Sequence, residues 1–283
     1  MSAKVINGKA IYSPKGAARE YGRVGCNFYT GCPHNCSYCY LKRGVLSHVM
    51  GGTEVKLKSC FDDLQDAYDV FLDEMAHNLN YLRQTGIFFS FSTDPLLEET
   101  RDLTLDSAIV AAGNGINVKI LTKAADADWW LHYIKGITKR ARSRMAFGFT
   151  LTGCDDMEPG APSNRERIEA MRKMHQAGHP TFASIEPVID VKRSVEMIRQ
   201  TSEFCDLYLI GLRSGVKKDY YRREDIDYLY SEVMAEHDYR SEHDFKAYWK
   251  ESIRKFFKDN KWEFLNKPYF VESDYNMFNP NNE

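Results

Sequence analysis

Residues 29–40 read Tyr29-Thr30-Gly31-Cys32-Pro33-His34-Asn35-Cys36-Ser37-Tyr38-Cys39-Tyr40, which places three cysteines in the spacing C-x3-C-x2-C. Three thiolates on one short loop can bind three irons of a [4Fe–4S] cluster, a cofactor that normally takes four cysteine ligands. No fourth cysteine follows closely in the sequence, so one iron would keep an open position for a substrate or cosubstrate. The stretch therefore predicts a centre of chemical reaction and not only a store of electrons.

A structural zinc site is the alternative for this loop, because Cys32, His34, Cys36 and Cys39 offer four nitrogen and sulfur donors. Structural zinc usually joins two ligand pairs that lie about a dozen or more residues apart. Four donors in one short loop close a tetrahedron poorly. The spacing therefore favours the cluster.

The composition indicates a globular protein with little net charge. The chain has 283 residues, of which 43% are hydrophobic, and a formal net charge of −2. This length fits one large α/β domain or two small ones, and the charge makes no global case for nucleic-acid binding. There is no apolar signal region, and no apolar run reaches the about 18 residues of a membrane span. We therefore expect a soluble, cytoplasmic protein that does not contact a membrane and uses its cysteines for metal or redox chemistry.

Strand-like and helix-like segments alternate along most of the chain. Apolar, β-rich runs predict strands at 24–29, 87–93, 117–122, 145–151, 181–188 and 206–212. Helical periodicity predicts helices at 61–82, 103–112, 126–137, 163–177 and 191–203, and Ser163 with Glu166 fits a capping box. Such alternation indicates βαβ units and a parallel sheet, which can close fully or partly into a barrel. Functional residues of these folds gather at the C-terminal ends of strands, and the cysteine loop directly follows the first strand.

The last part of the chain, from about Tyr220, is charged and aromatic, and we predict helices at 223–236 and 242–259. These would form a helical extension that packs on the barrel. The predicted division is therefore a barrel over 1–219 and an extension over 220–283.

Polar residues stand where the predicted strands end. Asp94, in the run Ser92-Thr93-Asp94-Pro95, could accept hydrogen bonds from the ammonium of a bound amino acid, although Asp-Pro also opens ordinary turns. Lys123 could pair with a carboxylate, or could be a solvated surface lysine. Glu186 stands among apolar residues and needs a partner, for which ribose hydroxyls, a substrate amine or a structural arginine would serve. The long acidic loop at 153–162 is either a substrate or cofactor loop or a surface connection.

The motif C-x3-C-x-aromatic-C resembles the signature of the radical S-adenosylmethionine (radical SAM) superfamily. The resemblance implies an α/β fold with a partial (β/α)6 barrel related to the TIM barrel. It also implies a [4Fe–4S] cluster whose open iron binds S-adenosylmethionine through its amino and carboxylate groups. One electron from the cluster then cleaves the sulfonium, and the released 5′-deoxyadenosyl radical abstracts hydrogen from a substrate.

Residues 21–187 further resemble the branch of this superfamily that contains spore photoproduct lyase, through Ser92–Pro95, Thr122-Lys123 and the run from Glu158 to Arg167. Carried over by position, the resemblance makes Cys32, Cys36 and Cys39 the cluster ligands. It makes Thr93, Asp94 and Lys123 contacts of S-adenosylmethionine and places Tyr38 beside the adenine, and Glu186 joins them as a candidate cofactor contact.

One departure separates this chain from the photoproduct lyases themselves. Those enzymes carry a hydrogen-donating cysteine shortly before the Asp that follows strand two, and the best alignment places Phe91 there. Cys154 or Tyr208 could replace that thiol and are the candidate catalytic residues. Because the near-neutral charge also disfavours duplex DNA, we do not expect a photoproduct lyase.

The sequence thus predicts a radical SAM enzyme, with its reaction subtype (lyase, isomerase or transferase) open. By analogy with the branch, its substrate would be a nucleobase, nucleotide or nucleic acid. A peptide or small metabolite is the alternative, as is a cluster-containing binding or regulatory protein without turnover. The expected partner is an electron donor such as a flavodoxin or ferredoxin.

Overall fold

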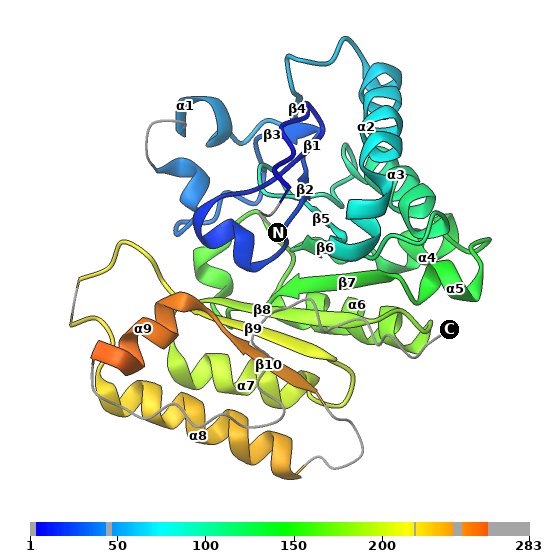
Figure 1. The fold of residues 1–283 in the computed structure, drawn as a ribbon. Helices are drawn as coiled ribbons and strands as arrows, with labels where there is room; N and C mark the ends of the chain where they lie inside the picture. Colours follow the sequence, from blue (N-terminus) through cyan, green and yellow to red (C-terminus); the bar gives the residue numbers. More distant parts are fainter. Residues whose placement is uncertain (1–3, 44–46, 218, 240–244, 260–283) are drawn as a thin grey trace.

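The computed structural model describes residues 4–43, 47–217, 219–239 and 245–259. Its centre is an eight-stranded sheet in the order β1-β2-β5-β6-β7-β8-β9-β10, in which every neighbouring pair is parallel except β1 with β2 (Figure 1). Its strands are Ile11–Tyr12, Gly25–Cys26, Ile87–Phe89, Val118–Thr122, Met145–Thr150, Thr181–Val188, Leu207–Leu212 and Lys246–Trp249. The predicted α/β fold with a partial barrel is confirmed.

Helices connect these strands. They are α1 to α9, at Ser47–Met50, Leu64–Thr85, Arg101–Gly113, Ala127–Tyr133, Lys139–Arg142, Asn164–Gln176, Val191–Thr201, Arg223–Tyr239 and Glu251–Asp259. The predicted capping box is present at the start of α6, where Ser163 and Glu166 bond each other's backbone N–H groups. None of the helices in the described ranges is long and apolar enough to cross a membrane.

Alternate residues of each strand face opposite sides of the sheet and build two apolar clusters. One lies between the sheet and the helices and takes, for example, Phe147 and Ile185. The other lies inside the barrel and contains residues of the opposite face of the same strands, such as Ala146 and Phe182. This alternation decides which strand residues can reach the barrel interior.

The predicted helix over 242–259 is wrong in its first half. Lys246–Trp249 forms strand β10, which pairs with β9, and only Glu251–Asp259 is helical (α9). The physical reason is alternation, because Ala247 and Trp249 enter the helix-facing core while Tyr248 enters the barrel interior. Residues 242–244 and 260–283 lie outside the described residues, and the division at residue 219 stays a prediction.

Candidate active site

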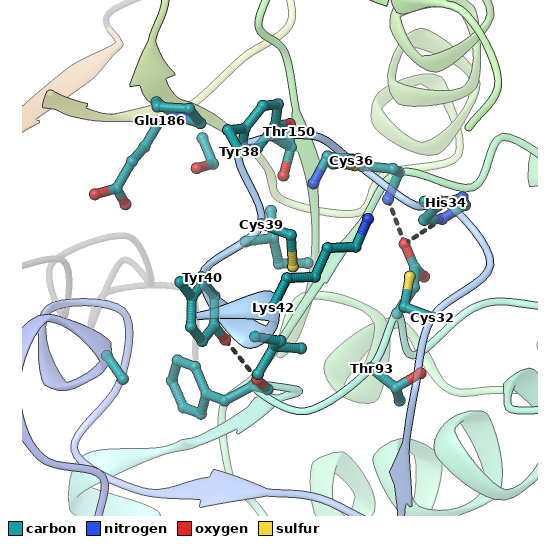
Figure 2. Close-up of a pocket in the computed structure, with 18 of the residues that line it drawn as sticks. Cys32, His34, Cys36, Tyr38, Cys39, Tyr40, Lys42, Thr93, Thr150 and Glu186 are labelled. Atoms are coloured by element: carbon teal, nitrogen blue, oxygen red, sulfur yellow. Dashed lines mark hydrogen bonds and ion pairs between the residues drawn. The ribbon is translucent and has the colours of Figure 1, made fainter. Parts of the chain in front are cut away.

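A cavity of about 510 Å³ opens at the C-terminal ends of the parallel strands, and the three motif cysteines line it (Figure 2). Residues at the ends of β5, β6, β7 and β8 and in the segments that follow β9 and β10 also line it. The structure thus brings together the eight residues predicted from the motif and the strand ends, namely Cys32, Cys36, Cys39, Tyr38, Thr93, Asp94, Lys123 and Glu186.

The cysteine loop is anchored by close backbone contacts. Gly31 has a φ of +81°, and a Cβ on it would lie 2.0 Å from the Glu54 carbonyl oxygen, so only glycine fits. The N–H of Cys32 donates to the Gly52 carbonyl at 2.9 Å. Burial, followed by the charge of Asp94, raises the pKa of Cys32 to about 12. A bound metal would have to displace this proton, because the thiolate is the ligand.

The residues after β5 hold the loop from one side. Ser92 Oγ donates to the Tyr29 carbonyl at 2.5 Å, and Thr93 Oγ1 donates to the Gly31 carbonyl. Thr93 therefore serves the cysteine loop, whatever contact it makes with a cofactor.

Asp94 is bound by four protein donors. Its Oδ1 accepts from Thr122 Oγ1 at 2.6 Å and from the Leu96 N–H at 3.0 Å, and its Oδ2 accepts from the Lys123 N–H at 2.6 Å and lies 2.9 Å from His34 Nε2. Burial alone would raise the pKa of Asp94, but the charge and hydrogen bond of His34 and the other donors lower it to about 2. Four donors fill the acceptor positions of a carboxylate, so the expected free acceptor for an ammonium group is not present.

His34 uses both ring nitrogens within the protein. Nε2 meets Asp94, and Nδ1 lies 3.1 Å from the Gly160 carbonyl oxygen. Among the residues that the structure describes, no three His, Cys, Asp or Glu side chains form a group that could hold a single metal ion. For the mononuclear zinc alternative, His34 would have to give up its contact with Asp94 or with Gly160 to become the fourth ligand.

The acidic loop after β7 supports the cysteine loop. The Ser37 N–H donates to the Met157 carbonyl at 2.9 Å. Tyr38 donates its hydroxyl proton to Glu158, and Glu158 pairs with Arg167 of α6; both charged side chains are fully buried. The acidic loop is therefore more than a surface connection, because it contacts the loop that carries the three cysteines.

Lys123 and Tyr38 form one wall of the cavity. The Lys123 ammonium lies 5.6 Å from the centroid of the Tyr38 ring. No carboxylate within the described ranges forms an ion pair with Lys123. The geometry is therefore compatible with the predicted pairing to a cofactor carboxylate.

Glu186 has two partners that the sequence did not reveal. Its Oε2 accepts from the Tyr21 hydroxyl and from Lys250 Nζ, the latter at 2.6 Å. Lys250 follows β10 and is 2% exposed. The sequence signal for Lys250 was the strand-like alternation of side chains over residues 246–250. The predicted helix over 242–259 hid this signal.

The two candidate catalytic residues lie outside the cavity. Tyr208 belongs to the helix-facing side of β9, and its hydroxyl lies 2.7 Å from Thr201 Oγ1. Cys154 is buried beside Arg193, with Sγ 3.6 Å from Nη1. Phe91, at the position of the missing thiol, does line the cavity and stacks on Phe88 with ring centroids 4.5 Å apart. Strand alternation points Tyr208 away from the barrel interior, and Cys154 packs against Arg193, so neither residue is among those that line the cavity.

Comparison with known proteins agrees with this geometry. The model of the radical SAM superfamily matches residues 26–226. The uncharacterized protein MJ0683 of Methanocaldococcus jannaschii is 25% identical over 195 residues, which cover 64% of this chain and 67% of that protein.

Two solved structures of spore photoproduct lyase share the fold. The enzyme complexed with dinucleoside spore photoproduct aligns with a TM-score of 0.61 and 14% identity, over 84% of this chain and 78% of that one. A double mutant with bound S-adenosylmethionine (AdoMet) and the same dinucleoside aligns with a TM-score of 0.58 and 15% identity, over 83% and 78%. Because the family model matches well over half of the residues, the chain belongs to the radical SAM superfamily, whose members use a [4Fe–4S] cluster and S-adenosylmethionine.

Proposed function

We propose that this protein is a radical SAM enzyme in which Cys32, Cys36 and Cys39 hold the cluster. The observation that carries the proposal is that all three thiols line one cavity at the C-terminal ends of parallel strands. None of the three forms a disulfide.

The donor set fits a cluster better than a single ion. Three cysteines supply thiolates, the ligands that iron–sulfur clusters require, while the nearby His34 and Asp94 are bound to each other. When bound, the cluster would supply the electron that cleaves S-adenosylmethionine to the 5′-deoxyadenosyl radical, which abstracts hydrogen from the substrate.

The chain's own residues would position the cofactor and shield it. Lys123 would bind the carboxylate of S-adenosylmethionine, and Tyr38, whose hydroxyl is fixed by Glu158, would present its ring to the adenine. Asp94 and Thr93 would act indirectly, by holding the cysteine loop through His34 and Gly31. Apolar side chains such as Phe88 and Leu121 limit water inside the barrel.

The leading substrate class is a nucleobase, nucleotide or nucleic acid, by analogy with the branch that shares the fold. The electron would come from a flavodoxin or ferredoxin. The cytoplasm remains the predicted location.

The test is anaerobic reconstitution with iron and sulfide, followed by S-adenosylmethionine and a strong reductant, with 5′-deoxyadenosine measured by mass spectrometry. We expect the product from the wild-type protein and none from Cys36→Ala. Cleavage that persists in Cys36→Ala would refute the ligand assignment. A complete cluster without cleavage would instead support the regulatory alternative.

A further inference from the structure

A series of hydrogen bonds runs along one wall of the cavity, where β8 ends and the segment after β10 begins. It joins Ser184, Tyr21, Glu186 and Lys250, all of which line the cavity. Figure 2 shows Glu186 well apart from Cys32 and Thr93. These residues thus form a second polar group in the cavity, on the side away from Cys32.

In this series of hydrogen bonds, each donated proton is directed toward Glu186. Tyr21 has one hydroxyl proton and gives it to Glu186 Oε2, so the bond of 2.7 Å between Tyr21 and Ser184 must use the Ser184 proton. Lys250 donates to the same Oε2. Glu186 is therefore the terminal acceptor, and its charge is balanced by Lys250.

The second oxygen of Glu186, Oε1, takes no part in these hydrogen bonds, and Glu186 lines the cavity. No donor in the described part of the chain bonds Oε1, and 23% of the Glu186 side chain is exposed. A Cβ on Gly211 would lie 2.7 Å from Oε1, so the absence of a side chain on this residue lets Glu186 lie over it. The group therefore offers a ligand one acceptor that the protein holds in place.

Charges of both signs surround the group. Lys250 lies 3.8 Å from Glu20, which in turn lies 3.5 Å from Arg254, and Arg254 also pairs with the exposed Glu251 at 3.4 Å. An anionic ligand would be repelled by Oε1, and a cationic one would be repelled by the ammonium of Lys250, which already pairs with Glu186. The group therefore favours a neutral hydrogen-bond donor.

The adjacent wall is flat and aromatic. Phe91 stacks on Phe88 with an interplanar angle of 22°, and both rings line the cavity together with Leu121. A planar ligand could stack on Phe91 while its edge reaches Glu186. An aliphatic or branched donor would use this wall less well.

Resting on the proposed function, we propose that Glu186 is a specificity-determining substrate contact that selects a neutral, planar nucleobase through a ring N–H donated to Oε1. Lys250, Tyr21 and Ser184 are positioning residues that hold the Glu186 carboxylate in place. This assigns Glu186 to the substrate and not to the cofactor.

The test is anaerobic equilibrium dialysis of the cluster-loaded, full-length protein against uridine and N3-methyluridine, which differ in the ring N–H. The wild-type protein should bind uridine roughly tenfold more tightly. In Glu186→Gln, Tyr21 and Lys250 would retain the amide oxygen and turn the amide N–H₂ toward the cavity, so this preference should vanish or reverse. Glu169→Gln, at an exposed position of α6, should keep the wild-type preference.

Equal affinity of the wild-type protein for both nucleosides, or binding of neither, would overturn the proposal. Tighter binding of N-acetylglycinamide than of uridine would overturn it in favour of a peptide. S-adenosylmethionine affinity should be unchanged in Glu186→Gln, and its loss would return Glu186 to the cofactor. The 5′-deoxyadenosine assay uses none of these probes. If the protein forms 5′-deoxyadenosine but binds both nucleosides equally, the Glu186 proposal is wrong and the proposed radical SAM activity stands.

Discussion

The Nε2 atom of His34 lies 2.9 Å from Asp94 Oδ2, and both side chains are buried. This pair joins the middle of the cysteine loop to the segment after β5. Because Nδ1 of the same ring faces the Gly160 carbonyl, His34 also connects that loop to the segment after β7. The cysteine loop is thus held from the ends of β5 and β7, the two strands that flank β6.

Replacing His34 with Ala should lower the affinity of the protein for the cluster, although His34 is not itself a ligand. We expect iron retention against a chelator to fall roughly tenfold, as is typical when a supporting contact of a metal site is lost. Iron content and absorbance of the reconstituted protein measure this. His77→Ala, at an exposed position of α2, is the control, and wild-type retention in His34→Ala would show that the pair does not support the loop.

Arg167 neutralises Glu158 in the interior, where both side chains are fully buried. Arg167→Met should destabilise the fold by about 3–5 kcal/mol, because it leaves a buried carboxylate unpaired. Urea unfolding measures the loss. The double variant with Glu158→Gln should lose less than the sum of the single variants, and additive losses would mean that the two residues are not coupled. Arg193→Met, whose pair with Asp156 is exposed, should change stability by less than about 1 kcal/mol.

Lys123→Ala should keep the absorbance of the cluster and reduce the affinity for S-adenosylmethionine roughly tenfold, because one charge-assisted contact is removed. Equilibrium dialysis of the reconstituted protein measures the affinity. The exposed Lys135→Ala serves as the control. An unchanged affinity would remove Lys123 from the site.

Cys154→Ala and Tyr208→Phe should leave the formation of 5′-deoxyadenosine at the wild-type level, because neither residue lines the cavity. The measurement is the same mass-spectrometric assay under identical reduction. A loss of product at normal cluster content would place that residue back in the reaction.

His179 should make stability depend on pH. Burial lowers its pKa from 6.5 to about 4, and its Nδ1 lies 3.1 Å from the Met145 carbonyl oxygen. Since the unfolded state takes up the proton first, this contribution is complete above pH 6.5 and is lost as the pH falls toward 4, by about 3 kcal/mol. Urea unfolding at both ends of this range should show a smaller pH effect for His179→Asn than for wild type. The exposed His77→Asn should behave like wild type, and a wild-type slope in His179→Asn would contradict the prediction.

Much of the fold could be read from the sequence because its signals are local. Strand alternation, helical periodicity and the Ser163–Glu166 capping box depend on neighbouring residues and were correct for the barrel. The segment around β10 was misread because four residues of alternation next to a helix carry little periodic signal. Only pairing with β9 defines that strand.

The sequence by itself determined the cysteine motif and the residues at the ends of successive strands, because parallel strands place their C-terminal ends at one edge. It could not determine how those side chains are used. The tertiary structure decided that Asp94 is bound by protein donors, that Tyr208 faces the helices, and that Lys250 meets Glu186 across 64 residues of sequence. Each of these depends on which groups meet in space after the sheet has formed, and no local pattern records it.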